Sequence, residues 1–446
     1  MSPIDVDADR VAAAAADEAI ALRAAGLGAG DSIGWLGLNG LRGLALLEAC
    51  RAVGARFVPL NWRLAPAELA TIAAHANLQR LWHDDALTAL AAEVAALVPL
   101  PQPRADDHQP GDLMLVYTSG TTGLPKGAVH TAAGMAANVE AAIDAQALDA
   151  ATRTLAVLPL FHVGGLCIQV RPTLAAGGVV RLHPRFDPGA WLHEVRRWRP
   201  TTSLLVPAVM RALIEHPDWA GADLSSLQFV AAGSQIVPPT LIEAFHARGV
   251  PVVQVYGSTE TGPVSVVLRR QDALAQVGRV GRPARGVRLK LAADGEICLQ
   301  APNLLRSYHR GVPRAFDADG WFHTGDLARE LADGVLEVVG RSSELIISGG
   351  ENIHPAEIEN LLAGHPDVAD AAVVGLPDAR WGEVPVLVLV PRSGHAIDAG
   401  ALQALFDARL ARYKHPRRIV VVEALPKTAL GKVARAALVR ALGDGA

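Results

Sequence analysis

The sequence has few of the features that are typical of disulfide-linked or membrane-spanning proteins. Its 446 residues include only three cysteines, and Cys50, Cys167 and Cys298 lie far apart with no CxxC pair. This spacing argues against a disulfide scaffold and against a zinc ribbon. A long uncharged run, between Arg153 and Arg171, is broken by proline and glycine. It is too short and too interrupted for the roughly 20 apolar residues that a membrane helix needs.

An excess of basic charge is also missing. Forty-one Lys and Arg stand against 45 Asp and Glu, for a net charge of −4, which provides no electrostatic footprint for nucleic acid. The first ten residues are acidic and lack the basic-then-apolar layout of a secretory signal. We therefore expect a cytoplasmic protein with no nucleic-acid partner and no membrane span. A homodimer is compatible with the sequence.

Lysine is scarce. Five of the 41 basic residues are lysine, and a chain that uses arginine elsewhere keeps lysine where a compact ammonium cannot be replaced by a planar guanidinium. Several of the five lie near Gly/Thr/Pro-rich segments, which favours functional roles over chance in an arginine-biased genome. They are Lys126, Lys290, Lys414, Lys427 and Lys432.

Half of the residues are hydrophobic, enough for a large core, and the length predicts two or three domains. Short apolar runs such as TLAVLPL and VVQVYG alternate with helix-period segments, a pattern typical of parallel sheet covered by helices on both faces. Gly-punctuated strands over about 280–339 predict a small β-rich subdomain. We therefore predict an α/β fold with a large N-terminal domain (residues 1–341) and a small α+β C-terminal domain (residues 342–446).

Residues 118–127, TSGTTGLPKG, could bind phosphate. Glycines let backbone N–H groups converge, four hydroxyls add donors and Lys126 adds charge. The spacing is not that of a Walker A loop, because Pro125 precedes Lys126 and Gly127 follows it. We expect the loop to follow a buried strand and to precede a helix. The alternative is a flexible surface turn.

Further motifs follow in order: PLFH at 159–162, YGSTE at 256–260, GWFHTGD at 320–326, GR at 340–341, SGGENIHPAEIE at 348–359 and PKTALGK at 426–432. Together with the loop, they resemble the adenylate-forming superfamily of acyl-CoA synthetases, luciferases and peptide-synthetase adenylation domains. The resemblance covers nearly the whole chain. It implies an acid–thiol ligase (EC 6.2.1.-) that activates a fatty or aromatic carboxylic acid with ATP and Mg²⁺ and transfers the acyl group to coenzyme A.

The resemblance implies a role for each motif residue. Thr259 would hydrogen-bond the α-phosphate, Glu260 would ligate magnesium, and Lys432 would bridge the substrate carboxylate and the α-phosphate. The adenine slot would be formed by Gly233, Ser234 and Gln235 with Tyr256, and the ribose hydroxyls would be held by Asp326 and Arg341. An acid at position 260 could instead be a solvated helix cap, and a lysine near the chain end is usually solvated. The nucleotide site would comprise Thr118, Ser119, Gly120, Thr121, Thr122, Gly123, Lys126, Gly233, Ser234, Gln235, Tyr256, Gly257, Ser258, Thr259, Asp326, Arg341 and Lys432.

The same resemblance implies a mobile C-terminal domain. It would rotate about Ser343, where many relatives carry Asp or Lys, and would bring Gly349 and Gly350 to the pantetheine arm. The acyl pocket would be apolar, gated by His162 and lined by Val163, Gly164, Val206, Val209 and Gly262. Arg171 could pair with a second substrate carboxylate, but more simply its charge reaches the surface.

Three alternatives stay open. The chain could load a carrier-protein phosphopantetheine instead of coenzyme A. It could act on a dicarboxylic acid of the o-succinylbenzoate type. It could also be a catalytically dead nucleotide-binding relative, against which the intact Lys126, Glu260, Asp326 and Lys432 argue.

Overall fold

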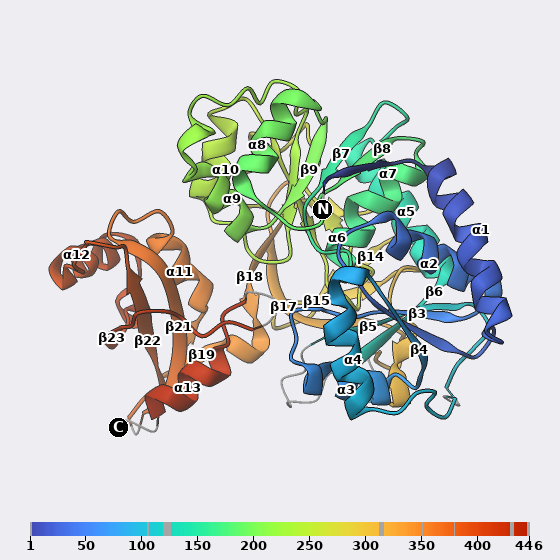
Figure 1. Cartoon of the computed structure of the whole chain (residues 1–446). Helices are drawn as coiled ribbons and strands as arrows, with labels where there is room; N and C mark the ends of the chain where they lie inside the picture. The colour runs from blue at the N-terminus through green and yellow to red at the C-terminus, as the bar shows by residue number, and fades with distance from the viewer. Residues whose placement is uncertain are drawn as a thin grey trace. The chain divides into compact units, whose positions relative to one another are not determined.

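The computed structural model forms two compact units. The large unit comprises Met1–Val237, Ala244–Leu289 and Leu299–His323, and the small unit comprises Pro238–Glu243, Lys290–Cys298 and Thr324–Ala446. Figure 1 shows the course of the chain through both. The structure describes residues 2–104, 107–118, 126–311, 316–349, 351–378, 380–428 and 432–443.

The large unit contains a six-stranded sheet in the order β16-β6-β5-β3-β2-β4 within the described residues. Strands β5, β3, β2 and β4 are parallel, whereas β6 and β16 are antiparallel to their neighbours. The strands are β2 Ser32–Leu36, β3 Arg56–Pro59, β4 Leu78–His83, β5 Asp112–Thr118, β6 Lys126–Thr131 and β16 Ser307–Tyr308. Helices of this half are α1 Ala8–Ala24, α2 Leu41–Val53, α3 Pro66–His75, α4 Thr88–Leu97 and α5 Ala132–Gln146.

A second sheet of the large unit has eight strands in the order β1-β8-β7-β9-β10-β11-β12-β13. Its centre, β8 to β11, is parallel, and antiparallel strands close both edges. The strands are β1 Ile4–Val6, β7 Arg153–Ala156, β8 Val179–Leu182, β9 Thr202–Leu205, β10 Val230–Gly233, β11 Val252–Tyr256, β12 Val266–Val267 and β13 Arg282–Pro283. Its helices include α6 Val163–Gly165, α7 Arg171–Ala175, α8 Pro188–Arg197, α9 Pro207–Ile214 and α10 Pro239–His246.

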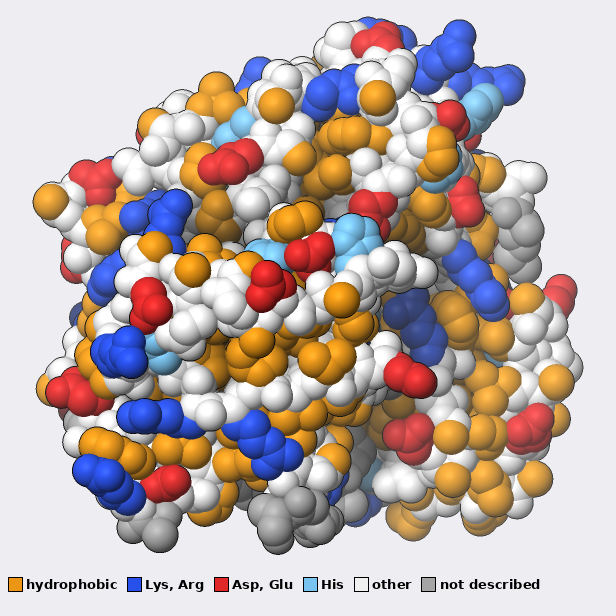
Figure 2. All heavy atoms as spheres, turned by 90° about the vertical axis from the view of Figure 1, so that its left-hand side faces the viewer, with side chains coloured by type: hydrophobic (Ala, Val, Ile, Leu, Met, Phe, Trp, Pro, Cys, Tyr) orange, Lys and Arg blue, Asp and Glu red, His pale blue; other side chains and the backbone are white. Residues whose placement is uncertain are grey.

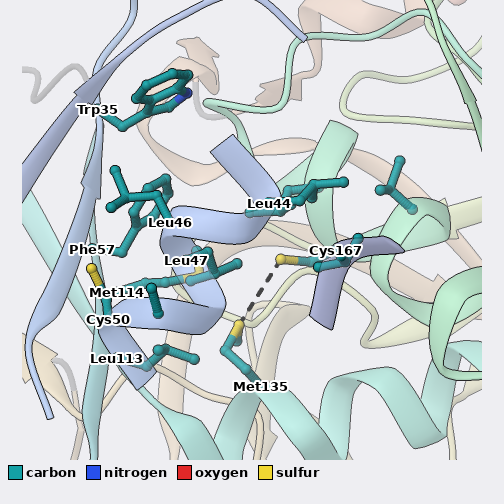
Figure 3. Packing of buried hydrophobic residues seen from close by; sticks show 14 of the residues in the cluster. Trp35, Leu44, Leu46, Leu47, Cys50, Phe57, Leu113, Met114, Met135 and Cys167 are labelled. Atoms are coloured by element: carbon teal, nitrogen blue, oxygen red, sulfur yellow. Dashed lines mark hydrogen bonds between the residues drawn. The ribbon is translucent and has the colours of Figure 1, made fainter. Parts of the chain in front are cut away.

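A shared apolar core joins the two halves of the large unit. Figure 3 shows Leu44, Leu46 and Leu47 of α2 among strand residues of the six-stranded sheet, with Cys167 of the 166–170 segment beside them. Val180 and Leu182 of β8 belong to the same cluster. The sulfur atoms of Cys167 and Met135 approach to 4.0 Å there. All three cysteines are buried and free, and burial raises the pKa of Cys167 to about 11. The thiols therefore act as small apolar side chains.

A four-stranded sheet follows, in the order β14-β15-β17-β18, with β14 Arg288–Leu291, β15 Glu296–Gln300, β17 Phe322–Glu330 and β18 Leu336–Arg341. These are the Gly-punctuated strands that the sequence predicted. Positive φ angles at Gly295 and Gly334 allow the tight turns that join neighbouring strands.

The small unit also contains a sheet covered on both faces. Its strands are β19 Ile346–Ser348, β20 Glu351–Ile353, β21 Val368–Asp378, β22 Gly382–Pro391 and β23 Arg418–Val421. Alternate residues of β22 enter different cores: Leu387 and Leu389 pack with Phe406 of α12 Ala399–Arg409. Val386 and Val388 pack with Leu438 of α13 Arg435–Gly443. Because both faces are buried, β22 is a nearly continuous apolar run. Helix α11 spans Pro355–Leu362.

The predicted α/β fold class is confirmed. The face drawn in Figure 2 mixes acidic, basic and apolar side chains, and neither sign of charge covers it continuously. Within the described part of the chain, no helix combines the length and apolarity that crossing a bilayer requires.

Candidate active site

Four neighbouring parallel strands of the eight-stranded sheet end at the same edge. The carboxyl ends of parallel strands meet at one edge of a sheet, so the order β7-β9-β10-β11 places the segments that follow them side by side. Residues 159–162 follow β7 and Val206 follows β9, while residues 233–235 and 256–260 lie at the ends of β10 and β11. We call this the carboxyl edge. Four separately predicted segments therefore come together there.

The proposed adenine slot depends on close backbone approach. Gly233 pairs with Val255 of β11, and a Cβ on Gly233 would lie 2.3 Å from the Val255 carbonyl oxygen. Ser234 has a φ of 68°, an uncommon conformation for a residue other than glycine. A Cβ on Gly164 would lie 3.5 Å from Ser234 Oγ, so the 163–165 segment also reaches this slot.

A tight turn carries Thr259 and Glu260. The N–H of Ser258 donates to Thr261 Oγ1 at 2.8 Å, and a Cβ on Gly257 would lie 1.9 Å from the Pro263 carbonyl oxygen. Only glycine fits at position 257, because the chain folds directly back over it. The turn holds Thr259 and Glu260 just beyond β11.

The carboxylate of Glu260 has a neutral hydrogen-bond donor. Tyr308 Oη lies 3.1 Å from Glu260 Oε1, and burial together with the Glu260 charge raises the pKa of Tyr308, so the phenol donates. His130, fully buried on β6, is close enough to feel the Glu260 charge, yet burial lowers its pKa to about 4. The imidazole is therefore neutral at physiological pH.

The predicted phosphate loop lies in the sequence between two paired strands. Strand β5 ends at Thr118 and β6 begins at Lys126, and these two residues pair across antiparallel strands. The expectation that a helix follows the loop directly was wrong: β6 intervenes, and α5 begins at Ala132. The run 127–131 forms a strand because Ala128, Val129 and His130 are all buried in the sheet. Ser119, Gly120, Thr121, Thr122 and Gly123 lie outside the described residues.

The predicted acyl-pocket residues lie near the carboxyl edge. His162 contacts Phe161, with ring centroids 4.4 Å apart, and Val163 begins α6. Val209 is buried on α9. Gly262, in the turn after Glu260, has a φ of +94°. Arg171 pairs with Glu48, Nη2 to Oε1, at 3.1 Å, so a second substrate carboxylate would compete with an existing ion pair.

The side chains of two buried asparagines hold the segments around the carboxyl edge by hydrogen bonds to backbone groups. Asn39 donates to the carbonyl oxygens of Leu158 and His183 at 2.9 and 3.0 Å and accepts from the N–H of Leu160 at 2.9 Å. Asn138 donates to the carbonyl of Cys167 and accepts from the N–H of Val264. Asn39 thus fixes the 158–160 segment, and Asn138 ties the 166–170 segment to the turn after Glu260.

Asn39→Ala is expected to destabilise the large unit by about 3 kcal/mol, because three backbone groups would lose their partner. Chemical denaturation of the two proteins measures this difference. Asn352→Ala, at an exposed position on β20, is the matched control and should stay within about 0.5 kcal/mol of the unchanged protein. Equal, small effects of both substitutions would contradict a structural role for Asn39.

The small unit pairs the two residues expected at the ribose. Asp326 on β17 lies opposite Arg341 on β18, and Arg341 Nε lies 2.8 Å from Asp326 Oδ1. The aspartate side chain is 11% exposed and the arginine 50%. A carboxylate held by a cation suits a diol, because its two oxygens can accept a hydrogen bond from each hydroxyl.

The remaining predicted residues also lie in the small unit. Lys432 is exposed, and its carbonyl oxygen accepts from the N–H of Thr428 at 2.7 Å. Ser343 lies in a short 3₁₀ turn, Ser342–Glu344, between β18 and β19. Gly349 has a φ of +62°, and Gly350 lies outside the described residues.

Two residues that contact predicted site residues, Tyr308 and Trp381, were not identified from the sequence. Tyr308 lies outside the motifs, and only the pairing of β16 with β6 brings it to the site. Trp381 is 37% exposed, and its ring lies 2.6 Å from where a Cβ on Gly349 would be. In the sequence, Trp381 is marked only by the glycine that follows it in RWGE, and this pattern alone does not indicate a functional residue.

The chain is similar to known proteins over nearly its whole length. The family described as AMP-binding enzyme matches residues 9–309, and the AMP-binding enzyme C-terminal domain matches residues 357–432. Indoleacetate–CoA ligase from Aromatoleum aromaticum is 43% identical, covering 93% of this chain and 89% of that protein. Feruloyl-CoA synthase from an Amycolatopsis species is 40% identical, covering 95% and 91%. The o-succinylbenzoate coenzyme A synthetase of Bacillus subtilis, solved with ATP and magnesium, has a TM-score of 0.85 at 31% identity, covering 96% and 93%.

Proposed function

The chain belongs to the AMP-binding enzyme family, and from this premise we propose how its residues carry out catalysis. It is an AMP-forming carboxylate–CoA ligase. A carboxylate oxygen bonds to the α-phosphorus of ATP while the bond to the pyrophosphate oxygen breaks. The sulfur of a thiolate then bonds to the acyl carbon, and AMP leaves with the electron pair of the acyl–oxygen bond.

The carboxyl edge is the observation that supports the site. It gathers the acyl segments after β7 and β9 and the nucleotide segments after β10 and β11. Acid and nucleotide would therefore meet between Val206 and Thr259, with Thr259 donating to the α-phosphate. Two bound reactants held in this way avoid much of the entropy cost of meeting.

The donor set at Glu260 suits magnesium. One carboxylate on a loop, completed by phosphate oxygens, is the arrangement that this hard cation prefers. Bound with the nucleotide, magnesium would supply charge neutralisation across the phosphates. Glu260 would orient that complex, Lys126 at the base of the phosphate loop would contact the β- and γ-phosphates, and Tyr256 would cover the adenine.

The two half-reactions need two arrangements of the small domain. We propose that residues 342–446 move as a body about Ser343. In the first arrangement Lys432 approaches the substrate carboxylate and the α-phosphate, while Asp326 and Arg341 hold the ribose hydroxyls. In the second, Lys432 withdraws and Gly349 and Gly350 approach the pantetheine arm. Such a motion would commit the enzyme to one half-reaction at a time.

The substrate we favour is an aromatic carboxylic acid. Val163, Val206 and Val209 offer an apolar lining, and Gly164 leaves room for a ring. Gly262 does not add to that room, because a Cβ there would lie 2.3 Å from the Asn303 carbonyl oxygen. The relatives named for indoleacetate and ferulate support this class. Arg171 is already paired with Glu48. A second substrate carboxylate would have to compete with that pair, which argues against a dicarboxylic substrate.

Pyrophosphate release tests the class of acid. Aryl-acetic, cinnamic-type, fatty and dicarboxylic acids would be compared, each with and without coenzyme A. We expect the highest kcat/KM with an aryl acid. A preference for dicarboxylic acids would overturn the assignment of an aromatic substrate. If none of the acids led to turnover of ATP, the ligase activity itself would be refuted.

Two features support coenzyme A as the acceptor. In the large unit, Arg63 and Arg185 flank Trp62, with Cζ atoms 5.2 and 4.5 Å from a ring centroid; such cations suit the nucleotide phosphates of coenzyme A. In the small unit, Trp381 lies against Gly349 and beneath Arg380 and Arg417. A glycine backbone beside an exposed ring suits a slender pantetheine chain.

Trp381→Ala is expected to raise the KM for coenzyme A about tenfold, since it removes one stacking and apolar surface, while adenylate formation changes little. The two half-reactions are followed separately, by pyrophosphate exchange and by thioester formation from synthetic acyl-AMP. Tyr413→Ala, another partly exposed aromatic side chain of the small unit, is the comparison. An unchanged KM for coenzyme A would remove Trp381 from the acceptor site.

A carrier-protein phosphopantetheine is the alternative acceptor. Free coenzyme A and free pantetheine distinguish the two, because only the former carries the nucleotide phosphates. If Arg63 and Arg185 bind those phosphates, coenzyme A should react far faster than pantetheine. Equal rates would favour the carrier protein.

A further inference from the structure

Residues 303–308 run alongside the turn that carries Glu260. Asn303 Nδ2 donates to the carbonyl oxygens of Thr261 at 2.8 Å and of Val264 at 3.2 Å. The N–H of Leu305 donates to the Glu260 carbonyl oxygen at 2.7 Å. The hydroxyl of Tyr308 donates to Glu260 Oε1 at 3.1 Å. One short segment therefore holds both the backbone and the carboxylate of Glu260.

The same segment is also part of the sheet that carries the phosphate loop. Tyr308 on β16 pairs with Ala128 of β6, the strand that begins at Lys126. Lys126 Nζ lies 5.8 Å from the centroid of the Tyr308 ring, within the range of a cation–π contact. Tyr308 thus contacts both the acid expected at the metal and the lysine expected at the phosphates.

We propose that Tyr308 is a positioning residue that fixes the Glu260 carboxylate for the magnesium–nucleotide complex and sets its place relative to Lys126. The proposal rests on the magnesium role of Glu260 given above. It assigns a task to a side chain that lies outside the motifs and that need not contact any substrate.

The physical reason is the freedom of a carboxylate on a turn. Glu260 has several rotatable bonds and two equivalent oxygens, each able to accept. The phenol occupies Oε1 and so leaves Oε2 as the oxygen available to a cation. Without the hydroxyl, the side chain would have to be ordered when the cation binds, and side-chain ordering costs free energy.

Tyr308→Phe tests this, since it keeps the ring, its packing and the contact with Lys126 and removes only the hydroxyl. ATP affinity is measured by isothermal titration without any carboxylic acid, once with saturating magnesium and once with chelator. We expect ATP binding with magnesium to weaken about tenfold, the range for a hydrogen bond to a charged group, while binding in chelator stays unchanged.

Tyr117→Phe is the matched control. It also removes one phenolic hydrogen bond in the same sheet, to His75 Nδ1 at 2.8 Å, but none to Glu260. It should therefore leave unchanged the magnesium increment, by which we mean the gain in ATP affinity between chelator and saturating magnesium. If Tyr308→Phe weakens ATP binding equally with and without magnesium, the hydroxyl is merely structural and the proposal is wrong.

Glu260→Gln tests the magnesium role of Glu260 separately from the role of Tyr308. A lost magnesium increment in Glu260→Gln but not in Tyr308→Phe would overturn the role of Tyr308 alone. An intact increment in Glu260→Gln would overturn the magnesium role of Glu260 itself. We expect the double variant to bind magnesium–ATP no more weakly than Glu260→Gln, because Tyr308 would act through that carboxylate.

Discussion

Replacing Lys432 by alanine is expected to slow adenylate formation by about 10²–10³-fold while sparing thioester formation from synthetic acyl-AMP. In the first half-reaction two anions meet, and a positioned ammonium between the carboxylate and the α-phosphate offsets their repulsion. Losing such a donor costs about 10²–10³-fold in rate. In the second half-reaction the new bond joins sulfur to the acyl carbon, so no new bond forms at the phosphorus that Lys432 would serve. Pyrophosphate exchange and thioester formation report the two separately.

The control is another lysine of the same motif. Lys427 pairs with Asp370, Nζ to Oδ2, at 2.8 Å. It lies close to Lys432, because Lys427 forms a β-bridge with Val433 and the N–H of Thr428 donates to the Lys432 carbonyl oxygen. Lys427→Ala should change both half-reactions by no more than a few-fold, because a half-exposed ion pair contributes about 0–1 kcal/mol. An equal loss of both half-reactions in Lys432→Ala would refute the proposed domain motion.

Glu260→Gln is expected to reduce the rate of adenylate formation by about 10²–10³-fold, equivalent to about 3–4 kcal/mol of lost charge stabilisation. The substitution keeps the shape of the side chain and a hydrogen-bond acceptor for Tyr308 but removes the negative charge. The dependence of the rate on magnesium concentration should shift to higher concentration. Initial rates of pyrophosphate release over a magnesium titration measure both effects.

An exposed acid elsewhere in the large unit serves for comparison. Glu140 lies on α5 and is exposed, so Glu140→Gln makes the same change of charge without touching the carboxyl edge. We expect its magnesium dependence to match that of the unchanged protein. Unchanged turnover in Glu260→Gln would remove Glu260 from the site.

Much of the fold followed from local sequence because its central strands are buried on both faces. Apolar runs such as VVQVYG indicate such strands directly, and the chemistry-bearing residues come immediately after them, at 233–235 and 256–260. Parallel order then brings those segments together without any long-range information beyond the fold class. The loop at 118–127 was the exception, because a short run such as AVHT can form either a strand or a helix start.

Contacts between segments far apart in the sequence could not be predicted in the same way. Tyr308 meets Glu260 only because β16 pairs with β6 and residue 305 bonds to the Glu260 backbone. Asn39 holds the 158–160 segment across more than a hundred residues. Neither residue has a distinctive neighbourhood in sequence, and a lone tyrosine or asparagine is compatible with many environments.

The proposed placing of the acid and the nucleotide after different strands of one sheet would have an evolutionary consequence. Side chains after β7 and β9 could then drift, and with them the choice of organic acid, while those after β10 and β11 would keep the chemistry of activation intact. New specificities would arise by a few exchanges at two strand tips. The same separation would make this chain a practical scaffold for engineering, in which recognition is rewritten and the energy-coupling step is inherited unchanged.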